Sequence, residues 1–510
     1  MECCPSPCDS TAILIPRRDV LKAFAAAPLA LGLSPVAEAA TLKVRYDAAS
    51  SKGQEMLAIY AAAVPRMQAL GPTHPMSWMW QWYTHFVDGS TTKTAEMSRI
   101  FGSNPSTLKT LANDTWDTCQ PHSGQNYNNF FPWHRLFVYY FERIVRQVSG
   151  RSDFTLPYWD YTSSDPAKRG VLPPQFILPD DPVFGSLYRP ERSSLANSGL
   201  PIQQGQPGDP MDISDALLKT TYSNVNSVQG FCRAIDSGIH GRIHVLVGNG
   251  DGMGTVPYAC NDPLFWVHHS NIDRMWASWN RTGGKNPTTA PWASASFVFA
   301  DVKGVRATRK LSSAFNAANM GYTYDALIPR PVAPTTTLAA TSMLSGTATL
   351  TGGSAPRLVG QARAGANLGA SAVDVDLLRI AGSHAASVLG LDAAHPEQRC
   401  YVVLKGLHAW AQPEVLYHLY LRPARAQRLQ PDNYVGNINF FDAEFHDHGG
   451  GAMAEALGEN FYSFDVTSIL QRLARNNVHA PDSLLLTIVP GGRPNPNAKP
   501  LVASMQLIRQ

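Results

Sequence analysis

Six histidines form two groups of three along this chain, and they constrain its fold more than any other feature. The groups are His85, His122 and His134, and His240, His244 and His269. Neutral imidazole is a common ligand of copper, zinc, iron and nickel, and three imidazoles per ion leave one face of each metal open. The two groups therefore predict a pair of metal ions that share a small bridging molecule. Because no Cys or carboxylate reads as a direct ligand, the pattern favours copper.

The chain is longer than one hydrophobic core usually supports. It has 510 residues, of which 44% are hydrophobic and 16% are charged, and this composition is typical of a folded protein with two or three domains. The formal net charge of +3 is nearly balanced, and no run of Lys and Arg in the body of the chain suggests a nucleic-acid groove. We therefore expect no nucleic-acid partner. The seven cysteines have spacings that form neither a disulfide framework nor a zinc framework.

Residues 1–40 are typical of an export signal. Arg17 and Arg18 precede an apolar stretch, and small residues follow around residues 37–40, which resembles a bacterial twin-arginine signal peptide. A chance Arg pair before an amphipathic helix and an uncleaved membrane anchor are the alternatives, although the apolar stretch is short for a stable span. The pattern predicts a periplasmic or extracellular protein without stable membrane insertion. Export of a folded protein allows the metal to be loaded first, with a copper-delivery chaperone as a possible partner.

The rest of the chain divides by its periodicity. Residues 41–327 have helical patterns with long irregular connections, including a Pro-, Gly- and Asp-rich excursion over about residues 151–226. Residues 328–353 are rich in Pro, Thr and Gly and predict a linker. Residues 354–510 contain short β-branched and aromatic runs between turn residues, which predict a β-sandwich. The fold class expected is a mainly α domain followed by an all-β domain.

The second histidine group has the stronger local pattern. His240 and His244 are four residues apart, so on a helix both imidazoles project from one face. Pro263 predicts the start of a helix that carries His268 and His269. Since neighbours on a helix point about 100° apart, only one of the two should face the metal, and we select His269.

The first group has a weaker local pattern. His134 is expected at the start of a helix, His122 in a loop, and His85 at the end of an aromatic helix. Taken singly, each has an ordinary alternative as a core histidine, a solvated loop residue or a helix-start residue.

The runs FFPWHRLFVYYFER and DPLFWVHHSNIDRMW, the latter preceded by HGRIH, resemble the type 3 copper proteins, which include tyrosinases, catechol oxidases and molluscan haemocyanins. The resemblance covers roughly residues 44–325 and implies a four-helix bundle that holds two copper ions. Copper A would be bound by the first histidine group and copper B by the second. Dioxygen would be the co-substrate, and o-diphenols would be oxidised to o-quinones.

Further residues agree with this resemblance. Arg45 lies near the start of the domain and Tyr322 and Tyr324 near its end, where the family often has an Arg and a Tyr-x-Tyr pair that close the domain. Asp273, four residues after His269, can accept hydrogen bonds from an imidazole or from a neighbouring Arg. The family often continues with a β-sandwich that covers the active site and keeps the enzyme latent, so a bulky side chain of residues 354–510 is expected over the metals.

The chain also departs from the family. His122 and His134 are twelve residues apart, and Cys119 precedes His122 as C-x-x-H, which is near but not identical to the motif that forms a thioether in some members. The alternative to a thioether is a free buried thiol. Active tyrosinases commonly have Asn after the first copper B histidine and Glu shortly before it, whereas this chain has Gly241 and Asp236.

The resemblance implies a tyrosinase-like phenol oxidase that hydroxylates monophenols and oxidises o-diphenols. Asp236 is the candidate base for the phenol proton through an ordered water, and a helix-capping Asp is the alternative. Val256 would leave room for a monophenol, whereas Gly241 lacks the side-chain amide of Asn that could orient the water. A diphenol-only catechol oxidase and a haemocyanin-like dioxygen carrier remain alternatives. A zinc hydrolase would need a catalytic carboxylate that HGRIH lacks.

Overall fold

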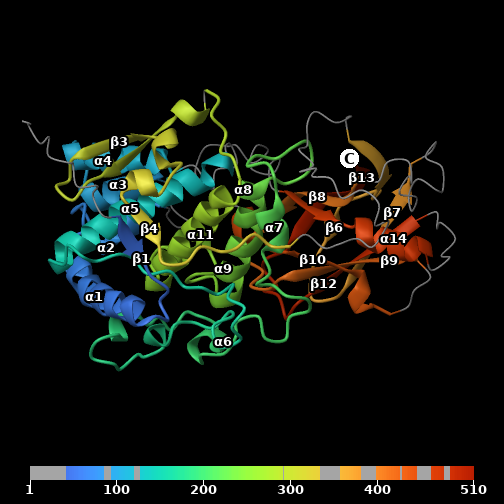
Figure 1. The fold of residues 1–510 in the computed structure, drawn as a ribbon, viewed down its shortest axis with the longest axis horizontal. Coiled ribbons are helices and arrows are strands. Elements are labelled where there is room, and N and C mark those ends of the chain that lie inside the picture. The colour runs from blue at the N-terminus through green and yellow to red at the C-terminus, as the bar shows by residue number, and fades with distance from the viewer. Residues whose placement is uncertain are drawn as a thin grey trace, which may run out of the picture. The chain divides into compact units, whose positions relative to one another are not determined.

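The computed structural model describes residues 42–85, 93–119, 127–290, 292–332, 356–380, 398–424, 428–444, 461–475 and 483–510. The predicted signal of residues 1–40, the candidate ligand His122 and most of the predicted linker lie outside these ranges. Figure 1 shows mainly helices in the blue to yellow-green part of the chain and mainly strands in the orange and red part. The predicted fold class, a mainly helical part followed by a β-rich part, is confirmed. The exact domain boundaries stay predictions.

The helical part contains long and short helices. Its described α-helices are α1 (Ser51–Gln68), α2 (Trp78–Tyr83), α3 (Lys93–Phe101), α4 (Thr107–Asp117), α5 (Phe130–Ser149), α6 (Ser194–Asn197), α7 (Ser214–Leu218), α8 (Phe231–Arg233), α9 (Gly241–Val247), α10 (Val256–Ala259) and α11 (Pro263–Arg281). The π-helix η4 (Ala234–His240) precedes α9 directly. Short 3₁₀ helices are η1 (Tyr127–Asn129), η2 (Pro174–Phe176), η3 (Gly185–Leu187), η5 (Trp292–Ser294), η6 (Leu311–Ala314) and η7 (Ala318–Met320).

Helices α5 and α11 pack together in the centre of this part. The apolar face predicted for α5 is buried, and Gly150, with φ 71°, ends the helix in the left-handed conformation. At the start of α11, the Asp262 carboxylate accepts the N–H of Leu264 at 2.8 Å, and Pro263 occupies the first position. The rings of Phe141 and Trp266 stack between the two helices with centroids 3.5 Å apart.

Strands β1 (Lys43–Arg45) and β4 (Tyr322–Tyr324) pair in parallel and bring the two ends of the helical part together. Arg45 donates to Glu142 Oε2 at 2.9 Å and to Asp273 Oδ2 at 3.0 Å, and its guanidinium lies 3.9 Å from the ring centroid of Tyr322. The hydroxyl of Tyr322 donates to Asp273 Oδ2 at 2.6 Å. The predicted closure of the domain by Arg45 and the tyrosines is therefore confirmed. A second small sheet pairs β2 (Ser296–Ala300) with β3 (Arg306–Lys310).

The irregular excursion after α5 is tied to the start of α11. Arg192 is buried with 4% exposure, and its Nε and Nη2 donate to the two carboxylate oxygens of Asp262 at 2.8 and 2.6 Å. The same guanidinium donates to the carbonyl oxygens of Phe176 and Leu187 at 2.6 Å each. One bidentate ion pair thus holds a long loop against the helix that carries His268 and His269.

The described residues of the C-terminal part form one nine-stranded sheet. Its strands are β5 (Arg357–Gln361), β6 (Ala366–Asn367), β7 (Val373–Arg379), β8 (Cys400–His408), β9 (Tyr417–Pro423), β10 (Tyr434–Ile438), β11 (Phe461–Asp465), β12 (Ser483–Pro490) and β13 (Leu501–Arg509). The order is β10-β9-β12-β7-β5-β13-β8-β11, with β6 paired to β13. Gly436 of β10 lies against the Phe464 ring of β11, so the two edges approach and the sheet is nearly closed. Helix α14 (Thr467–Arg475) and the 3₁₀ helices η8 (Pro431–Asn433) and η9 (Phe441–Ala443) complete this part.

Side chains of the helical part form hydrogen bonds with the sheet. Gln229 donates its N–H to Ser463 Oγ at 2.8 Å and its Nε2 to Phe461 O at 2.7 Å. His418 of β9 lies between the Gln206 Oε1 atom, 2.8 Å from its Nε2, and the Tyr434 hydroxyl, 3.1 Å from its Nδ1. Because Gln206 Oε1 only accepts, Nε2 of His418 carries a proton in this contact.

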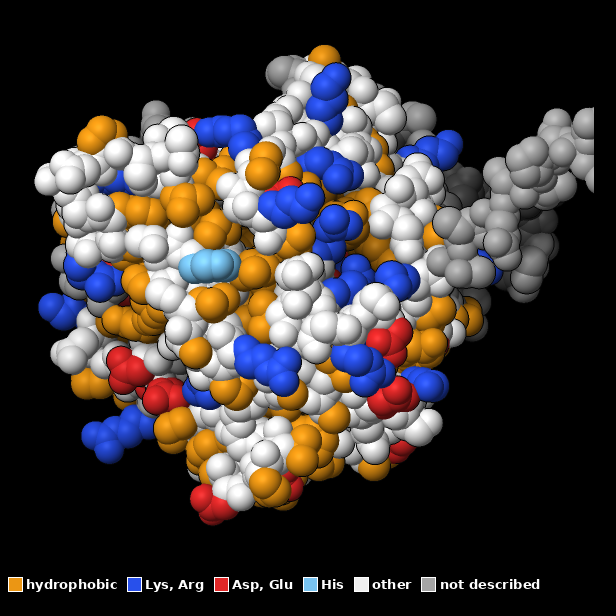
Figure 2. All heavy atoms as spheres, turned by 90° about the vertical axis from the view of Figure 1, so that its left-hand side faces the viewer, with side chains coloured by type: hydrophobic (Ala, Val, Ile, Leu, Met, Phe, Trp, Pro, Cys, Tyr) orange, Lys and Arg blue, Asp and Glu red, His pale blue; other side chains and the backbone are white. Residues whose placement is uncertain are grey.

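Charge is distributed differently at the surface and in the core. On the face shown in Figure 2, Lys and Arg side chains are spread between apolar and uncharged ones. The arginines that connect the secondary-structure elements are buried instead: Arg45 is 0% and Arg135 is 1% exposed. Among the described helices, none is both long and apolar enough to cross a lipid bilayer.

The first testable consequence concerns the buried ion pairs of Asp273. Asp273→Asn removes the charge that compensates Arg45 and Arg135, and both guanidinium groups stay buried. We expect the free energy of unfolding to fall by about 3–5 kcal/mol, measured by denaturant unfolding. The control is Asp153→Asn, which removes the half-exposed pair with Arg151 and should change stability little. Equal losses in both variants would contradict a structural role for the network.

The second consequence concerns acid stability. Burial lowers the pKa of His418 from 6.5 to about 4, so the folded protein favours the neutral imidazole. The contribution of this side chain to stability is complete above about pH 6.5 and is lost as the pH falls through about 4. We expect the melting temperature of the wild type to fall relative to that of His418→Gln between pH 7 and pH 4. Parallel melting curves for the two proteins across this range would contradict the prediction.

Candidate metal centre

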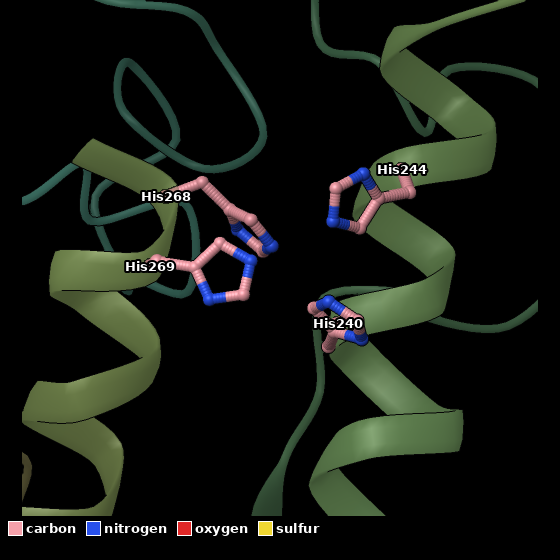
Figure 3. Close-up of side chains that lie close together, drawn as sticks. All are labelled: His240, His244, His268 and His269. Atoms are coloured by element: carbon pink, nitrogen blue, oxygen red, sulfur yellow. The ribbon is translucent and has the colours of Figure 1, made fainter. Parts of the chain in front are cut away.

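Four imidazoles from two helical segments meet inside the helical part (Figure 3). His240 ends η4 and His244 lies on α9, and their ring centroids are 4.6 Å apart, as the i, i+4 spacing predicts. His268 and His269 lie on α11 and face them. One ring nitrogen of each histidine lies within 4.8 Å of the corresponding atoms of the other three. This cluster is buried and can hold a metal ion.

The position of His268 differs from the expectation. The imidazole of His268 stacks on that of His240, with centroids 5.6 Å apart, and it lies 4.9 Å from the ring of His244. His269 points between the two histidine groups, because its ring stacks on His134 with centroids 4.2 Å apart. Both neighbours therefore lie in the cluster, and the choice of His269 over His268 as the metal ligand stays a prediction. The sequence signal was the HH pair itself.

The first histidine group adjoins this cluster. His134 lies in the first turns of α5, and His85 lies two residues after the end of α2, with the two ring centroids 5.7 Å apart. The apolar rings of Phe137 and Phe265 lie 5.7 and 5.2 Å from the ring of His85. Five of the six predicted ligands are therefore brought together, and the sixth, His122, lies outside the described residues.

Main-chain carbonyls orient three of the imidazoles. Nδ1 of His134 lies 2.9 Å from Phe130 O, and Nδ1 of His244 lies 2.7 Å from Met253 O. Nδ1 of His240 lies 3.1 Å from Asp236 O. Because a carbonyl oxygen only accepts, each Nδ1 carries the proton and each Nε2 presents its lone pair. This is the tautomer that a metal ion bound at Nε2 requires.

The two imidazoles of α11, His268 and His269, are also suited to a metal. Burial, together with the neighbouring His134 and His268, lowers the pKa of His269 well below its usual range, and burial lowers the pKa of His268 in the same way. Both rings are therefore neutral. Among the described residues, neither ring nitrogen of His269 has a hydrogen-bond partner. Buried imidazole nitrogens of this kind fit a metal that prefers nitrogen ligands, such as copper or zinc.

Asp236 lies beside the cluster and is completely buried. Its carboxylate accepts from Arg233 Nη1 at 3.0 Å and lies 3.4 Å from Nδ1 of His240. Burial and the neighbouring carboxylate of Asp442 raise the pKa of Asp236 above its usual range. Asp442 comes from the C-terminal part, and the sequence offered no signal that would place it here.

In the sequence, Gly241 precedes His244 and Val256 follows it. Gly241 begins α9 immediately after His240. Val256 is 3% exposed and begins α10, three residues after the carbonyl of Met253 that orients His244.

A phenylalanine of the C-terminal part covers the cluster. The ring of Phe441, in η9, stacks on His244 with centroids 4.0 Å apart and an angle of 7°, and it meets His240 edge-on at 5.5 Å. Gln412 Nε2 donates to the carbonyl oxygen of Phe441 at 3.1 Å and to Glu444 Oε2 at 2.9 Å. A bulky side chain was expected here, but the many aromatic residues of the C-terminal part gave no way to choose one from sequence.

Cys119 is a free cysteine close to the first histidine group. Its Sγ donates to the carbonyl oxygen of His85 at 3.0 Å. Burial raises the pKa of the Cys119 thiol well above its usual range, so the thiol is protonated. A thioether between Cys119 and His122 stays a prediction, because His122 lies outside the described part of the chain.

Comparisons with known proteins agree with this centre. A family model described as the common central domain of tyrosinase matches residues 75–206 and 187–282. Tyrosinase HcTyr1 of Hahella sp. (strain CCB-MM4) is 24% identical over 459 residues, which cover 86% of this chain and 93% of that protein. The chloroplastic polyphenol oxidase C of Solanum lycopersicum is 26% identical over 328 residues, and the match covers 56% of this chain and 51% of the plant enzyme. The chain thus spans nearly all of the bacterial relative but about half of the plant relative.

Solved structures resemble the whole fold. Latent apple tyrosinase has a TM-score of 0.59 and 19% identity, covering 92% of this chain and 97% of that structure. Latent aurone synthase, a polyphenol oxidase, has a TM-score of 0.59 and 17% identity, covering 92% of this chain and 90% of that structure. At these identities the likeness shows the fold, while the family model covers the segments that carry the two histidine groups. Residues 75–282 of this chain therefore contain the central domain of the tyrosinase family, which supports a type 3 copper protein of this family.

Proposed function

We propose that this protein is a tyrosinase-like phenol oxidase with two copper ions. One ion would be held by His85, His122 and His134, and the other by His240, His244 and His269. The observation that carries the proposal is the meeting of His134 and His269, one from each group, with ring centroids 4.2 Å apart in buried surroundings. Imidazole nitrogens with few competing carboxylates favour copper over magnesium or calcium.

Copper would supply the redox chemistry, since two one-electron centres can take from an o-diphenol the two electrons that it releases on becoming an o-quinone, with dioxygen as the final acceptor. The chain would supply binding, orientation and proton transfer. The carbonyl oxygens of Phe130, Asp236 and Met253 hold the imidazoles in one tautomer. This fixed orientation lowers the reorganisation needed when a metal and a substrate bind.

Asp236 is the proposed base for the phenol proton. A free phenol has a pKa of about 10 and is almost fully protonated at neutral pH, so a base near the metal is required. The burial of Asp236 beside His240 supports this role, and its raised pKa makes the carboxylate a stronger base than an exposed one. An ordered water would carry the proton from the phenol to the carboxylate.

Activity on both monophenols and o-diphenols is the proposal that we favour. The small side chain of Val256 leaves more space than a large aromatic residue would, which supports entry of a monophenol. Gly241 favours the alternative, a diphenol-only catechol oxidase, because glycine lacks the side-chain amide with which an Asn could orient a water. A haemocyanin-like carrier, which would bind dioxygen without oxidising phenols, is the less favoured alternative.

The C-terminal part would keep the enzyme latent. A substrate ring must approach the metal ions, and Phe441 occupies the space against His244 that such a ring would need. We propose residues 41–327 as the catalytic domain, residues 328–353 as a linker and residues 354–510 as a shielding domain. We also propose that residues 1–40 direct twin-arginine export to the periplasm or exterior, after copper delivery that a chaperone could assist.

The metal centre can be tested by copper analysis of the purified protein. We expect two copper ions per chain in the wild type and at most about one in His134→Ala and in His244→Ala, because each change removes one of three nitrogen ligands. The control is His408→Ala, a mostly buried histidine of β8, which should leave the copper content unchanged. A single copper ion per wild-type chain, or unchanged copper in both ligand variants, would contradict the proposal.

The reaction and the latency can be tested together by oxygen uptake with tyrosine, a neutral monophenol and a catechol. Phe441→Ala removes a stacked ring worth about 0.5–1.5 kcal/mol, so we expect roughly two- to tenfold faster catechol oxidation. Cleavage in the predicted linker should act in the same direction. Trp410→Ala, which changes an exposed aromatic residue of the same part, is the control and should match the wild type.

The three substrates distinguish the proposed tyrosinase-like oxidase from a diphenol-only oxidase and from a dioxygen carrier. Uptake with the catechol alone would identify a diphenol-only oxidase, and reversible dioxygen binding without quinone formation would identify a carrier. Equal rates for the wild type, the cut protein and Phe441→Ala would contradict the proposed latency.

A further inference from the structure

One carbonyl group beside the metal centre has lost its helical partner. In an α-helix the N–H of Gly241 would donate to the carbonyl oxygen of Ser237, four residues earlier. Here η4 is π-helical and Gly238 has a non-helical ψ of −110°, and the N–H of Gly241 donates to Asp236 O and Gly238 O instead. Helical irregularities of this kind release carbonyl groups. Because Ser237 is only 2% exposed, its carbonyl oxygen needs a hydrogen-bond donor, and the N–H of Gly241 does not supply it.

Two residues of the C-terminal part donate hydrogen bonds to the carbonyl oxygen of Ser237. Asn439 Nδ2 donates to Ser237 O at 2.8 Å, and the Tyr462 hydroxyl donates to the same oxygen at 2.9 Å. The Asn439 Oδ1 atom accepts the N–H of Phe441 at 3.2 Å. A single carboxamide therefore connects the Ser237 carbonyl with the backbone of the residue that covers His244.

Gly241 makes room for this carboxamide. Its φ of −63° and ψ of −34° are ordinary helical values, so the backbone conformation does not require glycine. A Cβ atom at Gly241 would lie 2.4 Å from Oδ1, 2.8 Å from Nδ2 and 2.9 Å from Cγ of Asn439. All three contacts are far shorter than van der Waals contact. The carboxamide cannot shift away without losing its bonds to Ser237 and Phe441, so glycine at this position is explained by the presence of Asn439.

We propose that the Ser237 carbonyl and the side-chain-free face of Gly241 form a socket for Asn439, and that this socket holds the C-terminal part closed over the histidines. The stacking of Phe441 on His244 then follows from the docked carboxamide, which fixes the Phe441 backbone. The inference rests on the proposed function only for its consequence, latency, because the docking itself needs neither copper nor a phenol.

Gly241→Ala tests the socket. Alanine suits the helical backbone at this position, so the helical part should fold at least as well, but its Cβ displaces Asn439. We expect amide hydrogen exchange of the full-length protein, measured on peptides covering residues 434–444, to become roughly tenfold faster or more, as expected for the loss of about two hydrogen bonds. Asn439→Ala should have a similar effect, because it removes the carboxamide and keeps Gly241.

A double variant and a control variant sharpen the test. In Gly241→Ala with Asn439→Ala the clash no longer exists, so the second change should add little to the first, and a strictly additive increase would overturn the socket. The control is Gly71→Ala, a glycine of the helical part whose added Cβ would meet no atom within 4 Å. Exchange in Gly241→Ala that equals that of the wild type would also overturn the proposal. Faster exchange in a protein that never oxidises a catechol would reject the proposed function and leave the socket intact.

Discussion

The metal centre depends on the hydrogen bonds and ion pairs that the buried carboxylate of Asp273 accepts. It accepts hydrogen bonds from Arg45, from Arg135 and from two tyrosine hydroxyls of β4. Arg135 follows His134 directly on α5, and Asp273 comes four residues after His269 on α11. The pair therefore sets the alignment of the two helices at the level of the imidazoles. A buried ion pair of this kind contributes little net stability by itself, but removal of one partner leaves an uncompensated charge, so the alignment is strongly specified.

The imidazoles need this external alignment because they cannot attract one another. Neutral imidazoles that turn their Nε2 lone pairs toward one another repel weakly, and apolar rings such as Phe137 and Phe265 offer them no hydrogen bonds. Main-chain carbonyls take up Nδ1 of His134, His240 and His244, which leaves Nε2 for a metal. The folded chain thus keeps a set of buried nitrogen donors in place, and metal binding would recover the free energy that their burial costs.

The C-terminal part completes the surroundings of the second histidine group. It contributes an aromatic ring over His244, a carboxylate beside Asp236 and a carboxamide against Gly241. These three contacts come from residues 439–442, a single short segment that follows β10 and continues into η9. The glycine after His240, where other family members often have Asn, therefore fits the covering segment. The backbone at Gly241 is ordinary helix, so its conformation does not require glycine.

The sequence by itself indicated a helical part followed by a β-rich part, because periodicity is a local property. It also indicated five candidate ligands that the structure brings together. The i, i+4 spacing marked His240 and His244, and the motif resemblance marked the other three. Arg45 and the tyrosines of β4 were also recognisable by their positions. Only the tertiary structure decided that His268 joins the cluster, that Phe441 is the covering ring and that the β-strands form one nearly closed sheet. Each of these depends on packing between segments far apart in the chain, which short-range patterns do not encode.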